Sequence, residues 1–300
     1  MYIYILLLVL FSKNSHAQHR EIYTQYAITP YLINPAAAAM DVKVATISCY
    51  ARKQWIGVYD APQSLHIQAS TYLNNFNSGL GLHLTADKLG PMRQYQSQVT
   101  YNYQLFLDEL RNGRLCIGLG AIIEMQGYDF GTITDLGLLS DDAIYTNNQN
   151  RTRFDIDAGV LYKSDMYALG IALENILQRS FNYQRKDSIY DKYKVPIHFN
   201  AYGRMIFKSS NEIFQFMPAF LIKYEKNLPY QFDFSVIAEW KKMISLGLNF
   251  RKDDAISALV GIRPRPWVHL GYAFDYTFST LKLSSNGSHE LGLTFFINKD

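Results

Sequence analysis

Hydrophobic and polar residues alternate over long stretches of this chain. From Phe154 to Tyr162 every second residue is apolar, and after a polar pair at 164–165 a second alternation begins at Tyr167. Because the side chains of a strand point alternately to its two faces, this stretch predicts a hairpin with one apolar and one polar face. Such a hairpin fits a soluble sandwich and also a barrel that crosses a membrane, so the other strands must decide between them.

The same alternation recurs along the chain and predicts fourteen strands. We expect them at residues 43–52, 64–73, 79–87, 94–107, 115–126, 153–163, 166–174, 198–207, 214–225, 232–241, 244–251, 255–263, 267–279 and 289–297. An even number allows an up-and-down barrel to close with both chain ends on the same side, as in bacterial single-chain barrels. After the first 17 residues, no stretch reaches the roughly 18 consecutive apolar residues of a membrane-spanning helix.

The lengths of the connections favour the membrane barrel. On the side where the chain enters the first strand, no predicted connection exceeds seven residues: 74–78, 108–114, 164–165, 208–213, 242–243 and 264–266. The opposite side receives 53–63 and the two longest connections, 127–152 and 175–197. Short turns on one side and long loops on the other are typical of outer-membrane barrels, and a soluble sandwich predicts no such regularity.

Glycines in mid-strand point the same way. Ten of them fall on the polar or small-residue face: Gly79, Gly81, Gly118, Gly120, Gly159, Gly170, Gly247, Gly261, Gly271 and Gly292. Glycine weakens a strand unless the strand bends there or another group approaches closely, and a closed, curved wall supplies such bends. We therefore predict an all-β fold, a closed antiparallel up-and-down transmembrane β-barrel of about 14 strands in the bacterial outer membrane, with the apolar faces toward lipid.

The segment before the first strand divides into two parts. An apolar run at 2–11 is followed by polar residues that end in Ser15-His16-Ala17, which predicts a secretory signal over residues 1–17. Residues 22–41 combine several aromatic side chains with Pro30 and Pro35, which discourage both helix and interior strand. We expect 18–42 to lie in the lumen or at its periplasmic rim, because a fourteen-stranded barrel has room to fill, and the barrel itself to occupy 43–300.

Composition narrows the possible partners. The net charge is only +3 and no basic run occurs, which argues against nucleic acid. The 23 Tyr and 18 Phe residues belong to types that favour strands and membrane interfaces. The two cysteines, Cys49 and Cys116, fall on strands that we do not expect to be neighbours, so no disulfide is implied.

Candidate chemistry on the polar face is sparse. Asp155 and Asp157 are neighbours on one strand face, a spacing that suits acid/base work or cation binding. We instead expect them to form a lumenal salt-bridge network with basic residues of polar-face parity: Lys163, Arg204, Lys241, Arg251 and Arg263. His66, His83, His198 and His269 share that parity but lack the local spacing of metal ligands. No nucleophile elbow or phosphate-binding glycine loop occurs, so we expect no enzyme activity, no cofactor and no metal.

Three segments also resemble a known family. QYAITPYLINPAAAAMD, at 25–41, resembles an opening in which a Gln-Tyr pair precedes the stretch INPA. ARKQWIGVYDAPQSLHI, at 51–67, resembles R-x-QW-x-G followed by a proline, and GLGLHLTADKLGPM, at 79–92, resembles a G-x-G strand that ends in Asp and Gly. In order and spacing these segments resemble the PorP/SprF-like outer-membrane proteins of the type IX secretion and gliding machinery of Bacteroidota.

The resemblance implies a non-catalytic barrel that assists secretion or cell-surface anchoring of an adhesin-like cargo protein, with that cargo, other type IX components and outer-membrane lipid as partners. The resemblance also implies a role in partner binding or in the plug for the residues at the motif positions. These are Gln25, Tyr26, Asn34, Pro35, Arg52, Gln54, Trp55, Gly57, Pro62, Asp87 and Gly90. A simpler interpretation is that Trp55 and Gly57 fold the first loop inward while Asn34-Pro35 fixes a turn. The alternative function is a porin-like or hydrophobic-solute channel, which would need an open lumen.

Overall fold

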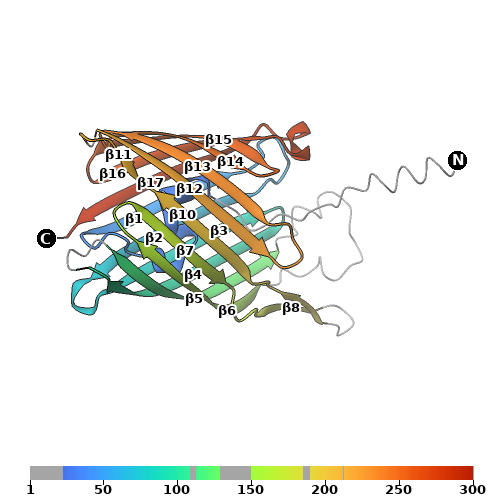
Figure 1. Cartoon of the computed structure of the whole chain (residues 1–300). Coiled ribbons are helices and arrows are strands. Elements are labelled where there is room, and N and C mark those ends of the chain that lie inside the picture. The colour runs from blue at the N-terminus through green and yellow to red at the C-terminus, as the bar shows by residue number, and fades with distance from the viewer. Residues whose placement is uncertain (1–22, 109–112, 129–149, 185–189, 212, 300) are drawn as a thin grey trace, which may run out of the picture.

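Fourteen strands form one closed antiparallel barrel, as the alternation predicted (Figure 1). The computed structural model describes residues 23–108, 113–128, 150–184, 190–211 and 213–299. The barrel strands are β1 (Val44–Lys53), β2 (Gln63–Leu73), β3 (Ser78–Leu89), β4 (Met92–Phe106), β5 (Arg114–Tyr128), β6 (Arg151–Lys163), β7 (Tyr167–Glu174), β10 (His198–Met205), β12 (Phe214–Glu225), β13 (Gln231–Trp240), β14 (Ile244–Arg251), β15 (Ala255–Arg265), β16 (Val268–Thr277) and β17 (Ser288–Asn298).

Hydrogen bonding between strands closes the wall completely. Strands that follow one another around the wall pair antiparallel, β1 pairs with β17 and β10 pairs with β12, so that no barrel strand is left as an edge. The two-residue strand β11 (Phe207–Lys208) extends the line of β10 against β12. Closure satisfies the backbone of every strand within the wall, which is the condition for crossing a membrane with strands.

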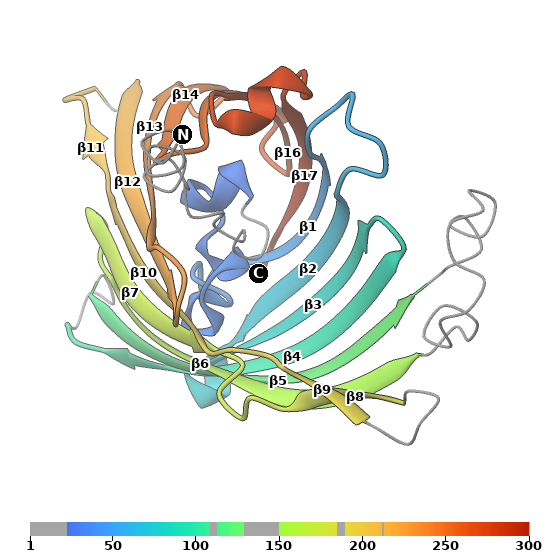
Figure 2. The same ribbon diagram turned by 90° about the vertical axis from the view of Figure 1, so that its right-hand side faces the viewer.

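The two ends of the barrel differ in their connections. Where β1 begins and β17 ends, the described connections are short turns such as 164–166 and 241–243. The other end carries the loops 54–62 and 278–287, and a separate hairpin of β8 (Ser180–Gln184) and β9 (Tyr190–Lys194) that extends beyond the barrel (Figures 1 and 2). Because outer-membrane barrels carry their long loops outside the cell, we assign this end to the cell surface and the other end to the periplasm. Residues 129–149 of the predicted loop 127–152 lie outside the described residues.

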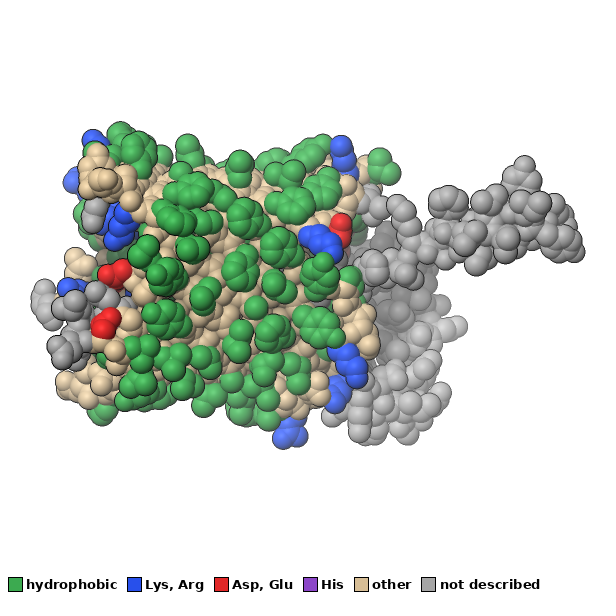
Figure 3. All heavy atoms as spheres, in the orientation of Figure 1, with side chains coloured by type: hydrophobic (Ala, Val, Ile, Leu, Met, Phe, Trp, Pro, Cys, Tyr) green, Lys and Arg blue, Asp and Glu red, His purple; other side chains and the backbone are tan. Residues whose placement is uncertain are grey.

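The outer face of the wall is apolar between the two ends. Figure 3 shows hydrophobic side chains covering the visible wall, with charged side chains gathered at both ends. Leu248 is 65% exposed in mid-strand, although soluble proteins rarely leave so continuous an apolar surface in water. The part of the chain that the structure describes contains no helix that is long and apolar enough to cross a membrane. Cys49, on β1, and Cys116, on β5, are both free.

The segment that precedes β1 lies inside the lumen of the barrel. Residues 23–42, here called the plug, form three short 3-10 turns: η1 (Thr24–Ala27), η2 (Pro30–Leu32) and η3 (Pro35–Ala37). Proline occupies the first position of both η2 and η3, where its fixed backbone angle suits a turn and its missing N–H is not needed. Figure 2 shows the plug, in blue, inside the ring of strands, so that of the two predicted positions, the lumen or its periplasmic rim, residues 23–42 occupy the lumen; residues 18–22 lie outside the described residues.

Candidate functional site

The plug fits against inward-facing glycines of the wall. A Cβ atom on Gly118 would lie 2.4 Å from the backbone nitrogen of Ala36, and one on Gly79 would lie 2.8 Å from the carbonyl oxygen of Ala38. Five further inward glycines similarly face Gln25, Tyr31, Asn34 or Pro35 of the plug: Gly81, Gly159, Gly170, Gly271 and Gly292. Wall curvature alone therefore does not explain these glycines. They occur where the plug approaches the wall too closely for a side chain.

Asn34 ties the middle of the plug to the wall. Its side-chain Nδ2 donates hydrogen bonds to the carbonyl oxygens of Val160, at 3.2 Å, and Ile171, at 3.1 Å, on β6 and β7. Its Oδ1 accepts from the backbone N–H of Ala36 at 2.8 Å and so caps η3, which begins at Pro35. The Asn34-Pro35 pair thus fixes a turn, as the simpler interpretation expected, and also fastens that turn to two strands.

Gln25 and Tyr26 hold the first turn of the plug. The backbone N–H of Gln25 donates to Glu290 at 3.1 Å. The fully buried Tyr26 ring meets Tyr202 edge to face, with ring centroids 6.3 Å apart, and its hydroxyl donates to the carbonyl oxygen of Asp233 at 3.5 Å. Burial raises the pKa of the Tyr26 phenol above its ordinary value, so the ring is a neutral packing group.

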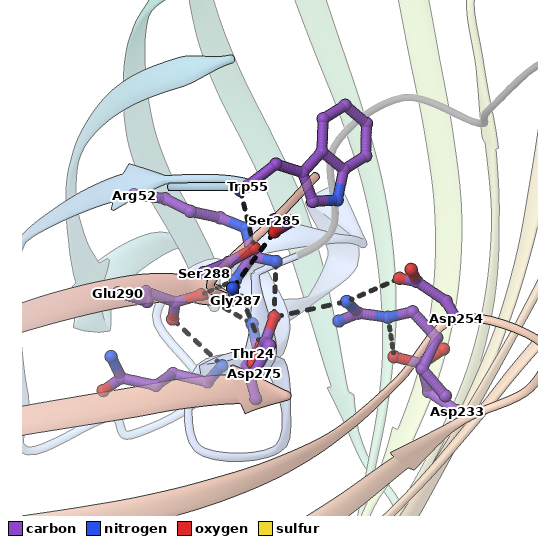
Figure 4. Close-up of polar contacts among 12 residues, drawn as sticks. Thr24, Arg52, Trp55, Asp233, Asp254, Asp275, Ser285, Gly287, Ser288 and Glu290 are labelled. Carbon is purple, nitrogen blue, oxygen red and sulfur yellow. Dashed lines mark hydrogen bonds and ion pairs between the residues drawn. The ribbon is translucent and has the colours of Figure 1, made fainter. Parts of the chain in front are cut away.

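Arg52 lies at the centre of a buried charge cluster at the surface end (Figure 4). Its guanidinium contacts Asp275 at 2.5 Å and Glu290 at 3.1 Å. Thr24 of the plug accepts from Arg52 at 3.2 Å, donates its hydroxyl to Asp275 at 2.9 Å, and donates its backbone N–H to Glu290 at 2.7 Å. The cluster therefore joins β1, β16 and β17 to the start of the plug.

Arg251 on β14 extends this cluster along the wall. Its Nε lies 3.0 Å from Asp233 on β13, and its Nη1 lies 3.5 Å from Asp275. Each buried carboxylate of the cluster thus has an arginine partner, and Asp275 is shared by two. Removing one arginine would leave a buried charge without its partner, which typically costs 3–5 kcal/mol.

The first loop stands on the rim of the barrel. The backbone N–H of Trp55 donates to the Ser288 hydroxyl at 3.1 Å, and Ile56 pairs with the neighbouring loop, donating to Gly287 at 2.8 Å and accepting from Asn286 at 2.7 Å. Figure 2 shows this loop rising beside loop 278–287 instead of crossing the lumen, so the expected inward fold is wrong. The indole of Trp55 points away from the charge cluster (Figure 4).

The remaining motif residues shape the same rim. Gly57 has φ +100° and Gly90 has φ +56°, both in the left-handed region that favours glycine. The N–H of Gln54 donates to the carbonyl oxygen of Pro62 at 3.0 Å and closes the base of the loop. The N–H of Gly90 donates to the carbonyl oxygen of Asp60 at 3.1 Å and connects the next turn to that loop.

Beside the plug the lumen keeps a small polar cavity of about 70 Å³. It is lined by both plug and wall residues, including Asp87 and Gln98. The ring centroid of His83 lies 3.9 Å from that of Tyr31 and 4.6 Å from that of His66. A space of this size holds a few water molecules and no solute of appreciable size.

Comparison with known proteins identifies the family. A family model described as "Type IX secretion system membrane protein PorP/SprF" matches residues 15–295. The chain belongs to this PorP/SprF family. No curated protein matches it. It is thus an outer-membrane β-barrel of a type IX secretion family, located in the bacterial outer membrane.

A solved structure shows that this PorP/SprF barrel shares its fold with a monoaromatic hydrocarbon channel. The "CymD monoaromatic hydrocarbon channel" is 9% identical, with a TM-score of 0.53 over 93% of this chain and 94% of that chain. The Acinetobacter baumannii outer membrane protein Omp33 is 7% identical with a TM-score of 0.47 over 86% and 98%, and the Pseudomonas putida toluene transporter TodX is 8% identical with a TM-score of 0.47 over 94% of each. At these identities the likeness to CymD concerns the fold alone.

In this PorP/SprF barrel the eleven motif residues separate into two groups. The buried group joins plug to wall: Gln25, Tyr26, Asn34, Pro35 and Arg52. The rim group shapes the surface end: Gln54, Trp55, Gly57, Pro62, Asp87 and Gly90. Sequence reasoning missed four members of the charge cluster: Thr24, Asp233, Asp275 and Glu290. The three acids could have been found from the sequence, because each occupies a position of the alternation that faces the lumen, where they are buried.

The expected network around Asp155 and Asp157 has different partners. Asp155 pairs with Arg153, two residues away on the same strand face, at 2.6 Å, and Arg153 also contacts Glu124. Asp157 accepts from the side chain of Gln98 at 2.9 Å. Besides Arg153, these carboxylates are therefore satisfied by Gln98 on β4 and by backbone N–H groups of the loop that follows β7: Asn175 donates to Asp157, and Leu177 and Arg179 donate to Asp155.

The basic residues expected in that network are used elsewhere. Lys163 and Arg204 donate to carbonyl oxygens of the plug, and Arg251 belongs to the cluster around Arg52. Lys241 and Arg263 lie against aromatic rings, at 5.0 Å and 4.7 Å from the ring centroids. Much of the inward basic charge therefore serves to hold the plug.

Proposed function

We propose that this barrel is a non-catalytic scaffold that assists secretion or surface anchoring of a type IX cargo protein, acting with other components of that system. The observation that carries the proposal is the fitted plug. Glycines of the wall receive its backbone, Asn34 fastens its middle, and the Arg52 cluster fastens its start. A lumen that its own chain occupies suits a binding scaffold better than a path for solutes.

The surface end offers a contact area for such a cargo. Tyr59 on loop 54–62 is 78% exposed and Leu283 on loop 278–287 is 95% exposed. Trp55, four residues before Tyr59 on loop 54–62, is half-buried, and backbone hydrogen bonds hold this loop to loop 278–287. Tryptophan and tyrosine often dominate interface energies, and a loop that is already ordered loses little entropy on binding.

Co-purification from native cells tests this proposal. We expect the tagged barrel to retain a secreted surface protein, and Trp55→Ala to reduce the retained amount about tenfold or more, as for a hot-spot residue. Trp267→Ala is the matched control, because Trp267 stacks on Phe295 near the periplasmic end and faces lipid. Equal retention by the two variants would remove Trp55 from the contact.

Current through planar bilayers separates the proposal from the transport alternative. The intact barrel should pass little current, and a variant lacking residues 23–38 should pass more. An intact barrel that conducts freely and retains no cargo would favour the porin-like or hydrophobic-solute channel. Heat-modifiable migration on gels shows whether the shortened variant has folded.

A further inference from the structure

A row of polar and basic side chains crosses the outer wall at the surface end. The strand register places five residues as successive partners on β17, β1, β2, β3 and β4, in the order His289, Lys53, Gln63, Lys88 and Arg93. Their positions alternate with buried inward residues, so all five belong to the lipid-facing side. With adjacent strands roughly 4.8 Å apart, this row, here called the basic row, spans about 19 Å.

A second row lies one step nearer the middle of the membrane. Its register partners on the same five strands are Leu291, Ala51, Leu65, Ala86 and Tyr95. The side chains of the two alanines are shorter than those of their leucine and tyrosine neighbours and leave a depression in the wall. Together the two rows line a groove of about 630 Å³ on the outer wall. The groove is thus basic toward the cell surface and apolar toward the membrane core.

The three cations of the basic row differ in the contacts that they make with the protein. Lys53 is exposed and makes no ion pair with any residue that the structure describes. Arg93 is oriented by donating to the carbonyl oxygens of Gly90, at 2.7 Å, and Met92, at 3.3 Å. Lys88 lies 3.4 Å from Asp60, a partly exposed pair of the kind that contributes little to stability. An incoming anion can therefore be met by Lys53 and Arg93, with Lys88 between them.

The basic row is confined to one part of the wall. On β14, β15 and β16 the last outward residues at the surface end are Phe250, Ile256 and Tyr276, which are apolar or aromatic. The cations of the basic row therefore have no counterpart at the corresponding positions of β14, β15 and β16.

We propose that this groove binds a phosphorylated glycolipid of the outer leaflet, of the lipopolysaccharide class. Phosphate groups would lie on Lys53, Lys88 and Arg93, since clustered basic residues at a membrane boundary recognise anionic headgroups. An acyl chain would occupy the low floor over Ala51 and Ala86. The proposal rests on charge complementarity, on the position of the row at the edge of the apolar belt, and on the surface orientation of that end.

Quantifying the lipid that remains on the purified barrel tests this proposal. The first variant replaces Lys53, Lys88 and Arg93 with Gln, and its matched control makes the same change of charge at the periplasmic end, at Lys241, Lys242 and Arg265. We expect the intact barrel and the control to retain phosphorylated lipopolysaccharide and the first variant to retain at least about tenfold less. Heat-modifiable migration confirms that each variant is folded.

A second variant, Ala86→Phe, fills the groove and leaves the charges intact, and it should also lower retention. Added lipopolysaccharide should rebind to the delipidated barrel, whereas dephosphorylated lipopolysaccharide or vesicles of phosphatidylglycerol should compete weakly. Unchanged retention in both groove variants would overturn the proposal. Equal competition by phosphatidylglycerol would also overturn it, because the groove would then recognise negative charge and not the glycolipid.

Discussion

Replacing Gly118 with Ala tests whether the plug and the wall are fitted to each other. The added Cβ would lie 2.4 Å from the backbone nitrogen of Ala36 and 2.6 Å from the carbonyl carbon of Pro35. Ordinary contacts begin at 3.4 Å, so the backbones must separate by about 1 Å. The plug cannot yield freely there, because Asn102 donates hydrogen bonds to the carbonyl oxygens of Ala36, at 3.0 Å, and Ala38, at 2.5 Å.

The expected cost follows from these contacts. Overpacking in a filled interior costs about 1–3 kcal/mol, and one weakened buried hydrogen bond adds about 1 kcal/mol. We therefore expect Gly118→Ala to weaken docking of the plug by about 2–4 kcal/mol, which raises the undocked fraction at least about 30-fold. Hydrogen exchange of residues 34–38 should accelerate accordingly, and the current through the barrel should increase.

Gly120→Ala is the control for this prediction, since it lies two residues away on the same strand and face. Its Cβ would meet the end of the Gln98 side chain, at 2.1 Å from Nε2, which can rotate away with the loss of one hydrogen bond to Asp157. Exchange of the plug should stay close to that of the intact protein. Equal exchange rates and currents in the two variants would show that the glycine face is not fitted to the plug.

Three other predictions concern stability, topology and export. Arg52→Ala should lower the free energy of unfolding in urea by about 3–5 kcal/mol, because buried Glu290 loses its arginine partner and Asp275 keeps only Arg251, and Arg52→Lys should restore part of it; no loss in either variant would contradict the cluster. In a cysteine-free background, Ser284→Cys should react with an impermeant thiol reagent on whole cells and Asn75→Cys should not, whereas reversed labelling would invert the assigned orientation. The mature chain should begin at Gln18 and stay with outer membranes after carbonate washing, and its recovery from the soluble periplasm would contradict the fold.

The strands were predictable because the membrane imposes a strict requirement on one face. Lipid must meet apolar side chains along the whole wall, so the alternation at Phe154 and Asp155 marks outside and inside without knowledge of any partner strand. The hairpin of β8 and β9 was missed within the predicted loop 175–197. It forms a separate sheet at the surface end, where the requirement for a lipid-facing apolar side does not act, and Phe181 on β8 is buried beside Arg153 on β6.

The lumenal contacts were less predictable, since they join residues far apart in the chain. Arg52 and Asp275 are separated by 223 residues, and only the register of the closed wall brings them together. The glycines were recognised as unusual, but the groups that approach them belong to a segment without regular periodicity. The alternation along each strand identifies which residues face the lumen. It does not specify the path that the plug takes through the lumen.

The central claim is tested most directly by measuring the fraction of type IX cargo that stays bound to cells. The comparison is between a strain lacking this chain and the same strain complemented with it. If the plugged barrel assists secretion or anchoring, the deletion strain should lose surface-bound cargo, which is then shed into the medium or held inside, and complementation should restore it. If the cargo remains fully attached to the surface of the deletion strain, the scaffold function is contradicted. A freely conducting purified barrel would then establish transport in its place.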